Sequence, residues 1–314
     1  MVRKLFTCLL ATLLTGICWA AGTQKTVSKT QPKTKAEIIV IESDEHAAGK
    51  EDLQLTQAIS QFLEVVPSVT HLTAAKAAED PKLANLDYSF LPLYLIKKTK
   101  AIRSKLEKHL QYGYVQENDD FIIMPHQTRQ GVYTNKPVQK NVMDLFVMSQ
   151  CPYGVRAENL IIQAQKDGTF PTDKTVRVRY IVDYNPAQGF NSMHGSGEWE
   201  ENVRQLLIAK YYPKKFWKYL EIRNKDYRSS RWDKAMEQAG IDVKKIMKKF
   251  DTEGLELLKE EAKYTKEYGI SGSPSVVWEG RVLMGLDGAA ALEGFGFFAP
   301  KMPSGAVAAP SGSC

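Results

Sequence analysis

A strand-like run that meets a helix-like run at a cysteine constrains this chain more than any other feature. Val142 to Met148 is apolar, Cys151 follows after two polar residues, and Tyr153 to Ala164 has the apolar spacing of a helix. Unpaired N–H groups and the helix dipole at such a terminus lower a thiol pKa from about 8.5 towards about 3.5 to 7.5. Pro152 suits the first helical turn, where a missing N–H costs little. We therefore predict an accessible, reactive thiol at Cys151, and the alternative is an inert, half-buried thiol, as most free cysteines are.

Length and composition indicate two globular domains. The chain has 314 residues, of which 43% are hydrophobic and 25% charged, and it is longer than one typical domain. Strand and helix patterns alternate, which predicts α/β domains over residues 36–135 and 141–298 with a polar, turn-rich boundary between them. A helical insertion is expected over about 198–250 in the second domain.

The apolar periodicity places the individual elements. In the first domain we expect a strand at Ala36–Ser43, a helix at Leu53–Val66, strands at Ser68–Thr73 and Leu91–Ile96, a helix at Ile102–Leu110 and a hairpin at Tyr114–Met124. In the second we expect a strand at Val142–Met148, a helix at Tyr153–Ala164, a strand at Thr175–Val182, helices over Glu198–Phe250 and Glu253–Tyr268, and a hairpin within Ile270–Gly285.

Residues 1–20 have the pattern of a cleaved secretory signal peptide. A short basic start precedes an uncharged apolar stretch from Leu5 to Trp19, and a small-residue site ends at Ala20. The stretch is shorter than the roughly 20 residues that a membrane span needs. An uncleaved anchor or a lipoprotein is the alternative, although Ile17 before Cys18 fits lipidation poorly. We expect a periplasmic or secreted protein with no stable membrane span after cleavage.

The composition of the rest of the chain limits the classes of partner that we expect. Residues 21–35 contain four lysines and no acidic residue, so a flexible basic linker is expected, and residues 299–314 have the composition of a flexible tail. Loss of Arg3 and Lys4 with the signal peptide takes the formal net charge from +6 to +4. This charge is too mild to argue for nucleic-acid binding, since the sequence spreads its basic residues among acidic ones. The histidines have no metal-ligand spacing. We expect no nucleic acid, metal or cofactor.

A second motif accompanies the cysteine. Cys151-Pro152-Tyr153-Gly154 follows a strand, Gly272-Ser273-Pro274-Ser275 precedes a hairpin, and a helical segment separates them. Over about Val142 to Phe298, this combination resembles the DsbA-like branch of the thioredoxin-fold superfamily. The resemblance implies a cis peptide before Pro274, which would face Cys151, and a Ser273 backbone that pairs with substrate. It also places Pro152 and Tyr153 beside the substrate.

The motif departs from that family at Gly154. The family's C-x-x-C pair uses its second cysteine to resolve a mixed disulfide, and here glycine stands in that place. After signal cleavage only Cys151 and Cys314 would remain. Cys314 is therefore a candidate resolving thiol on the flexible tail. The alternative is an incidental cysteine, or one that pairs between chains.

A fainter likeness concerns His194. Met193 to Trp199 is similar to the histidine-glycine signature of the gamma-interferon-inducible lysosomal thiol reductases, although Trp199 stands where they carry a cysteine. This makes His194 a candidate partner for the Cys151 thiolate. The alternative is a plain turn before a helix, with the acidic pair Glu200-Glu201 as its solvated start. The aromatic residues from Tyr211 to Tyr219 have helical spacing, which favours core packing over a ligand-binding belt.

The first domain resembles the same superfamily more weakly. No cysteine follows its opening strand, and Leu91-Pro92-Leu93 is a candidate cis-proline strand of its own. We predict a smaller, degenerate thioredoxin-like α/β domain, structural or substrate-binding, without thiol chemistry. An unrelated α/β domain is the alternative.

Three functions remain open. The first is a secreted or periplasmic thiol-disulfide oxidoreductase or isomerase, in which Cys151 exchanges with protein or small-molecule thiols and disulfides and an external reductant or oxidant resets it. The second is a redox-inactive, chaperone-like module that binds peptides in the groove beside Pro274. The third is a transferase-like protein that holds a small thiol such as glutathione near Cys151.

Overall fold

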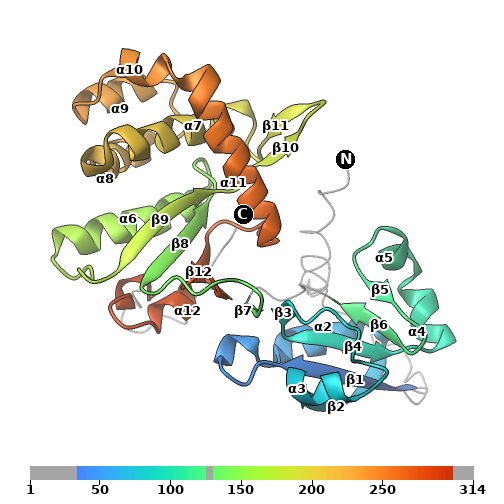
Figure 1. Ribbon diagram of the computed structural model, residues 1–314. Helices are drawn as coiled ribbons and strands as arrows, with labels where there is room; N and C mark the ends of the chain where they lie inside the picture. The colour runs from blue at the N-terminus through green and yellow to red at the C-terminus, as the bar shows by residue number, and fades with distance from the viewer. Residues whose placement is uncertain (1–33, 125–129, 300–314) are drawn as a thin grey trace, which may run out of the picture. The chain divides into compact units, whose positions relative to one another are not determined.

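The computed structural model describes residues 34–124 and 130–299, which divide into two units between Thr134 and Asn135 (Figure 1). The predicted signal peptide, nearly all of the predicted linker, and Cys314 with nearly all of the predicted tail lie outside the described residues. Both units have α/β architecture, as the sequence predicts. None of the helices in the described ranges is long and apolar enough for a bilayer crossing.

The first unit has a five-stranded sheet in the order β2-β1-β4-β6-β5. Its elements are β1 (Thr34–Glu42), η2 (Ala47–Gly49), α2 (Leu53–Leu63), β2 (Val65–Thr73), α3 (Ala74–Glu79), β3 (Phe90–Leu91), β4 (Leu93–Lys97), α4 (Lys100–Lys105), α5 (Glu107–Gln111), β5 (Gln116–Glu117), β6 (Phe121–Met124) and β7 (Gly131–Tyr133). Strand β1 pairs in parallel with β2 and antiparallel with β4, so Ile38 lies opposite both Val69 and Ile96. This βαβ unit followed by an antiparallel strand is the thioredoxin-like arrangement.

The first helix ends earlier than the sequence pattern predicts. Asp52 caps α2 by accepting the N–H groups of Gln54 and Leu55, and the helix stops at Leu63 because Glu64 takes a left-handed conformation with φ 55°. The predicted helix to Val66 is therefore wrong at its end, and the chain from Val65 belongs to β2.

Two other predicted elements of this unit are divided. The strand expected at Leu91–Ile96 is split around Pro92 into β3 and β4, and the Leu91–Pro92 peptide is cis. The helix expected at Ile102–Leu110 is two short helices, because the chain leaves helical geometry at Leu106. The expected hairpin is present as the β5–β6 pair, with Gln116 opposite Ile123.

The second unit repeats the same plan around a long insertion. Its elements are β8 (Val142–Val147), α6 (Pro152–Lys166), β9 (Thr175–Tyr180), β10 (Asp183–Asn185), β11 (Gly189–Asn191), α7 (Ser196–Tyr211), α8 (Pro213–Arg223), η3 (Asn224–Asp226), α9 (Trp232–Gln238), α10 (Val243–Met247), the π-helical turn η4 (Phe250–Gly254), α11 (Leu255–Glu267), β12 (Ser275–Trp278), β13 (Val282–Met284), α12 (Leu286–Ala290) and η5 (Gly296–Phe298). Its strands lie in the order β13-β12-β8-β9. Strand β8 is parallel to β9 and antiparallel to β12, so Leu145 lies opposite both Val178 and Val276.

The insertion between β9 and β12 forms a helical layer with its own core. Helices α7 to α11 gather at one end of this unit (Figure 1), around buried residues that include Leu207, Tyr219 and Met236. The predicted core packing of the aromatic segment holds for Phe216 and Tyr219, which are buried, while Tyr211, Tyr212 and Trp217 are half-buried against the same core. The β10–β11 hairpin before α7 was not predicted.

Candidate active site around Cys151

Cys151 occupies the N-cap of α6. Its backbone is extended, with φ −82° and ψ 124°, and Pro152 follows in the first helical turn. The Cys151 side chain accepts no capping hydrogen bond, while its N–H donates to the carbonyl of Met148 at 2.9 Å. The sulphur therefore stands at the helix terminus that the sequence predicts, where backbone N–H groups favour an anion.

Cys151 is oxidised in this structure. It is disulfide-bonded and has no exposed surface. The accessible thiol that the sequence predicts is therefore not present in this oxidised form. It is the one cysteine of the described ranges.

The loop before β12 meets Cys151 directly. The Ser273–Pro274 peptide is cis, and the Cys151 Sγ lies 3.6 Å from the Ser273 carbonyl oxygen. The Ser273 hydroxyl accepts the N–H of Met148 at 2.9 Å. Since Ser273 and Pro274 are both buried, this loop is fixed against the end of β8 and against the cysteine at once.

Gly154 leaves no room for a second cysteine. A Cβ at this position would lie 2.6 Å from the Ser273 hydroxyl oxygen and 3.2 Å from both the Met148 carbonyl oxygen and the Val147 Cβ. A side chain at residue 154 would have to displace the Ser273 hydroxyl from its bond to Met148. The serine therefore fills the space that a C-x-x-C cysteine would need.

Tyr153 is the predicted substrate contact that reaches solvent. Its side chain is 41% exposed, two residues after Cys151, and Pro152 beside it is exposed as well. A half-exposed aromatic ring next to the Cys151 sulphur offers apolar area to a bound chain. The fold thus brings together the start of α6, with Cys151 and Tyr153, and the loop before β12, with Ser273 and Pro274.

The sequence analysis missed Glu198, which holds the loop before Cys151. Its buried carboxylate accepts the N–H of Gln150 at 3.1 Å, and its backbone carbonyl accepts the Ser149 hydroxyl at 3.2 Å. On the other side, the Arg228 guanidinium donates to the Gln150 carbonyl at 3.4 Å. Two residues of the helical insertion therefore clamp Gln150, the residue that immediately precedes the cysteine, through its N–H and its carbonyl group.

His194 joins this clamp through Glu198. Its Nδ1 lies 2.6 Å from the Glu198 carboxylate, and its backbone N–H donates to the other carboxylate oxygen at 3.4 Å. The predicted influence of His194 on Cys151 therefore remains a prediction, with Glu198 and Gln150 as the connecting groups. No sequence signal marks Glu198, because it faces the loop only through the tertiary fold.

The acidic pair at the start of α7 is divided between two environments. The predicted solvated helix start is wrong for Glu201, which is fully buried, while Glu200 remains partly exposed. Glu201 accepts hydrogen bonds from Arg204 Nε at 3.0 Å and from the Tyr219 hydroxyl at 2.7 Å. Helix α8 covers this face of α7, so the carboxylate serves the core of the insertion.

Glu158 is a buried carboxyl on the cysteine-bearing helix. It lies about two turns after Cys151. One oxygen accepts the Asn224 amide at 2.9 Å, and the other has no hydrogen-bond partner. Burial raises the pKa of Glu158 to about 7, with a smaller upward contribution from Glu201 and an opposing effect of the Asn224 hydrogen bond.

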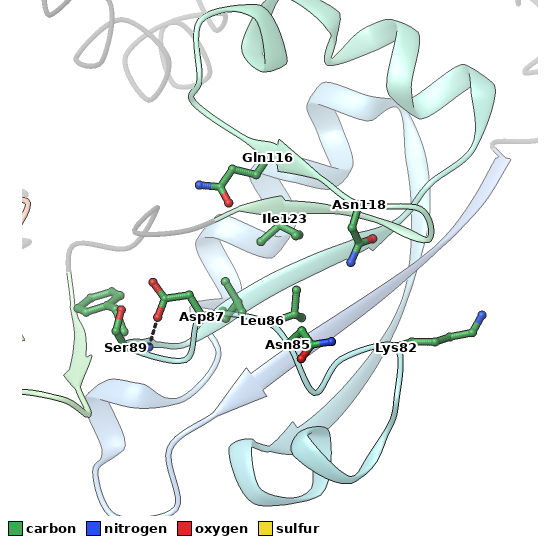
Figure 2. A pocket seen from close by; sticks show the side chains of 10 residues that line it. Lys82, Asn85, Leu86, Asp87, Ser89, Gln116, Asn118 and Ile123 are labelled. Carbon is green, nitrogen blue, oxygen red and sulfur yellow. Dashed lines mark hydrogen bonds between the residues drawn. The ribbon is translucent and has the colours of Figure 1, made fainter.

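The first unit has a cavity in which several polar lining residues already have partners within the fold. Ten of its residues line a space of about 470 Å³ (Figure 2). Asn118 already accepts the Phe121 N–H, Asp87 accepts the Ser89 N–H, and Lys82 pairs with Asp120 at 3.0 Å. No group of three or more potential metal ligands occurs in the described ranges of either unit.

The chain is similar to several solved structures, each over about half of its length. SrgA from Salmonella enterica serovar Typhimurium matches with 16% identity over 54% of this chain and 92% of its own, at a TM-score of 0.36. The oxidoreductase DsbA from Proteus mirabilis matches with 15% identity over 52% and 86%, at 0.36. BdbD from Bacillus subtilis matches with 15% identity over 47% and 82%, at 0.35.

No protein-family model and no curated protein matches the chain. At the identities and TM-scores of the solved structures, similarity alone decides nothing about activity. The thioredoxin-like fold of the second unit therefore rests on its strand order, on its pairing directions and on the placement of Cys151 beside the Ser273–Pro274 loop.

Proposed function

We propose that this protein is a secreted or periplasmic thiol-disulfide oxidoreductase or isomerase that acts through Cys151. The observation that carries the proposal is a disulfide-bonded cysteine at the N-cap of a helix, with its sulphur 3.6 Å from the Ser273 carbonyl oxygen. The helix terminus stabilises the thiolate form of Cys151. A thiolate that attacks readily also leaves readily, so it suits both halves of an exchange cycle.

In the reductive direction, the Cys151 thiolate attacks one sulphur of a substrate disulfide. The substrate S–S bond breaks, a mixed disulfide forms at Cys151, and the other substrate sulphur leaves as a thiolate. A second thiolate then attacks the Cys151 sulphur and displaces the remaining substrate sulphur. An external dithiol reductant returns the resulting protein disulfide to two thiols and is itself oxidised to a disulfide. Protonation of each departing thiolate completes the balance.

The proposal assigns the second thiolate to Cys314. Position 154 has no room for a local thiol, and Cys8 and Cys18 would leave with the predicted signal peptide. A flexible chain of the length of residues 299–314 has a root-mean-square reach of roughly 20 to 25 Å, enough to bring its terminal thiol to a site on the same domain. Cys314 would then supply the second thiol, which the motif lacks because residue 154 is glycine.

The substrate class follows from the surroundings of Cys151. The half-exposed Tyr153 ring and the main chain at Ser273 suit an extended peptide that carries a thiol or disulfide. A small thiol such as glutathione would use Cys151 without needing these contacts. The groove would also serve a peptide-binding module without turnover, which is the alternative function that the experiment must separate.

The test is steady-state reduction of a peptide disulfide by the purified protein with a dithiol donor. We expect turnover that falls at least about 1,000-fold in Cys151→Ser, since the thiolate is the nucleophile. Cys314→Ser should accumulate the mixed disulfide and turn over slowly, and mass spectrometry of the oxidised wild type should find a peptide joining Cys151 to Cys314. Stable capture of peptide by Cys151→Ser, with no turnover in the wild type, would identify a binding module instead.

A further inference from the structure

One surface of the helical insertion gathers lysines around a pair of tyrosines. The half-buried rings of Tyr211 and Tyr212, at the end of α7, face ammonium groups from α8, from α10 and from the residue two positions after α10. Lys249 lies 4.5 Å from the Tyr211 centroid, and Lys245 and Lys215 lie 5.3 and 5.5 Å from that of Tyr212. These are cation–π distances. They show that the two rings and the three cations form one continuous surface.

We call this the Lys–Tyr surface. It comprises Tyr211 and Tyr212 with the three lysines over their rings, Lys215, Lys245 and Lys249, together with the lysines adjacent to these residues in sequence, Lys210, Lys214, Lys244 and Lys248. Its helices lie together in the insertion (Figure 1). Glu253 neutralises part of the charge, because its carboxylate pairs with Lys210 at 2.6 Å and with Lys249 at 3.0 Å.

Most of the other lysines keep their charge uncompensated. Within the described ranges no carboxylate forms an ion pair with four exposed lysines of the surface, namely Lys214, Lys244, Lys245 and Lys248. Some lysines elsewhere in the same unit do find partners, as Lys166 does with Glu221 at 2.8 Å and Lys259 with Glu256 at 2.6 Å. Four lysines without an ion pair thus lie within residues 214–248.

The rest of the described chain has the opposite balance. Residues 210–249 contain 13 lysines and arginines against 5 aspartates and glutamates, whereas the other described residues contain 22 against 31. The modest net charge of the whole sequence therefore conceals a strong separation of charge. A surface of this kind attracts a polyanionic partner over distances of about a Debye length, roughly 8 to 10 Å.

The residue types favour a diffuse anionic partner. The Lys–Tyr surface has seven lysines and no arginine. Lysine is a flexible point charge, whereas bidentate recognition of individual carboxylates, phosphates or bases favours arginine. Half-buried tyrosine rings such as Tyr211 and Tyr212 suit the headgroup level of a bilayer. We propose that the Lys–Tyr surface binds the headgroups of an anionic lipid bilayer, independently of the thiol chemistry at Cys151.

The first measurement is partitioning of the purified protein onto lipid vesicles. Vesicles of phosphatidylcholine with about 30% phosphatidylglycerol should bind it at least tenfold more strongly than pure phosphatidylcholine vesicles at low salt, since each lysine near an anionic surface adds roughly fivefold. The preference should disappear near 0.5 M salt, where screening is strong. Equal binding to both vesicle types would overturn the proposal, and so would binding to soluble heparin without binding to vesicles.

Matched charge variants locate the effect. The triple variant Lys244→Glu/Lys245→Glu/Lys248→Glu should lose about 100-fold or more in partitioning, by the same contribution per lysine. Lys76→Glu/Lys100→Glu/Lys108→Glu changes the same charge at exposed lysines of the first unit and should stay near the wild type. Both variants retain the four lysines of residues 21–35, so a contribution from that segment cancels. Equal losses in the two variants would refute the assignment, provided that circular dichroism shows both to be folded.

Discussion

The first and second units both pair a first strand in parallel with a second strand and antiparallel with a third. Both have a cis X–Pro peptide immediately before the third strand, at Pro92 and at Pro274. The units differ at the N-cap of the helix that follows the first strand. Asp52 caps α2 with its carboxylate, whereas Cys151 caps α6 with a sulphur that accepts no capping hydrogen bond.

The residue before each cap is nevertheless held in the same way. In the first unit Glu42 accepts the N–H of Glu51 at 2.8 Å and pairs with His71 Nδ1 at 3.1 Å. In the second unit Glu198 accepts the N–H that precedes Cys151 and pairs with a histidine. The first unit draws this glutamate–histidine pair from β1 and β2, and the second draws it from the insertion.

The third strand reaches the cap in the first unit, and the loop before the third strand does so in the second. The Asp52 N–H donates to the Tyr94 hydroxyl of β4 at 2.6 Å, where the second unit sets the Ser273 carbonyl against the Cys151 sulphur. One helix terminus thus has a carboxylate cap and the other has a sulphur. Under the proposed function, the chemistry therefore depends on the cap residue, on a support that both units share.

The largest expected effect comes from removing the glutamate that holds the residue before the helix cap, in one unit at a time. Glu198→Ala should slow disulfide exchange by Cys151 by about 100-fold, because small displacements of a reacting group cost rates of this order. Glu42→Ala removes the corresponding pair in the first unit and should leave the rate within about twofold. Both rates would be measured by alkylation of reduced Cys151 and by peptide-disulfide exchange, in a Cys314→Ser background.

Glu198→Gln separates position from charge in that experiment. Its amide oxygen can still accept the Gln150 N–H, so a positioning role predicts recovery of most of the rate. A Glu198→Ala protein that is folded and exchanges at the wild-type rate would contradict the clamp. An equal loss in Glu42→Ala would show that the effect is general destabilisation.

A second difference lies in what the two helices bury. Helix α2 buries Thr56 and Ser60, whereas α6 buries Glu158. The folded-state pKa of Glu158, about 7, is above the ordinary 4.5, so the folded state retains a proton that the unfolded state releases. The resulting penalty is small near pH 4.5, grows between pH 4.5 and 7, and is fully present above pH 7.

Glu158→Gln removes this penalty. Relative to the wild type, the variant should gain about 2 kcal/mol more unfolding free energy at pH 8 than at pH 5. Urea unfolding under reducing conditions at the two pH values measures the difference. Ser60→Ala, whose hydroxyl donates to the Thr56 carbonyl, should change stability equally at both. A Glu158→Gln effect that does not depend on pH would show that the carboxyl is ionised in the fold.

Short sequence patterns predicted those features of the site that depend on neighbouring residues alone. The junction at Cys151 and the cis peptides at Pro92 and Pro274 follow from short motifs. Glu198 and Glu201 did not, because a helical sequence gives no sign of which acidic side chain another part of the chain will cover. The end of α2 was missed for a related reason. Val65 and Val66 fit a helical face, and only pairing with β1 places them in a strand.

The close approach at Gly154 gives the next prediction. Gly154→Ala should destabilise the second unit by about 1 kcal/mol, because overlap with the Ser273 hydroxyl outweighs the helix preference for alanine. In a Ser273→Ala background the same change should become neutral or stabilising. Gly49→Ala in the first unit is the matched case, and its Cβ would meet the Ser43 Cβ at 2.4 Å. Ser43→Ala should therefore give no relief there. Additive effects at Gly154 and Ser273 in a double-mutant cycle would refute the overlap.

The smallest effect tests the caps themselves. Asp52→Ala removes the acceptor for the N–H groups of Gln54 and Leu55, at 2.9 and 3.2 Å, and should cost about 1 kcal/mol of unfolding free energy in the first unit. Asp52→Asn keeps an acceptor oxygen and should recover most of that loss. In reducing buffer, Cys151→Ser should be neutral or slightly stabilising in the second unit, because serine caps a helix better than a thiol that makes no capping bond. Urea unfolding followed separately by probes in each unit makes the measurement. If Cys151→Ser costs as much as Asp52→Ala, the sulphur is itself a structural cap and the contrast between the two units fails.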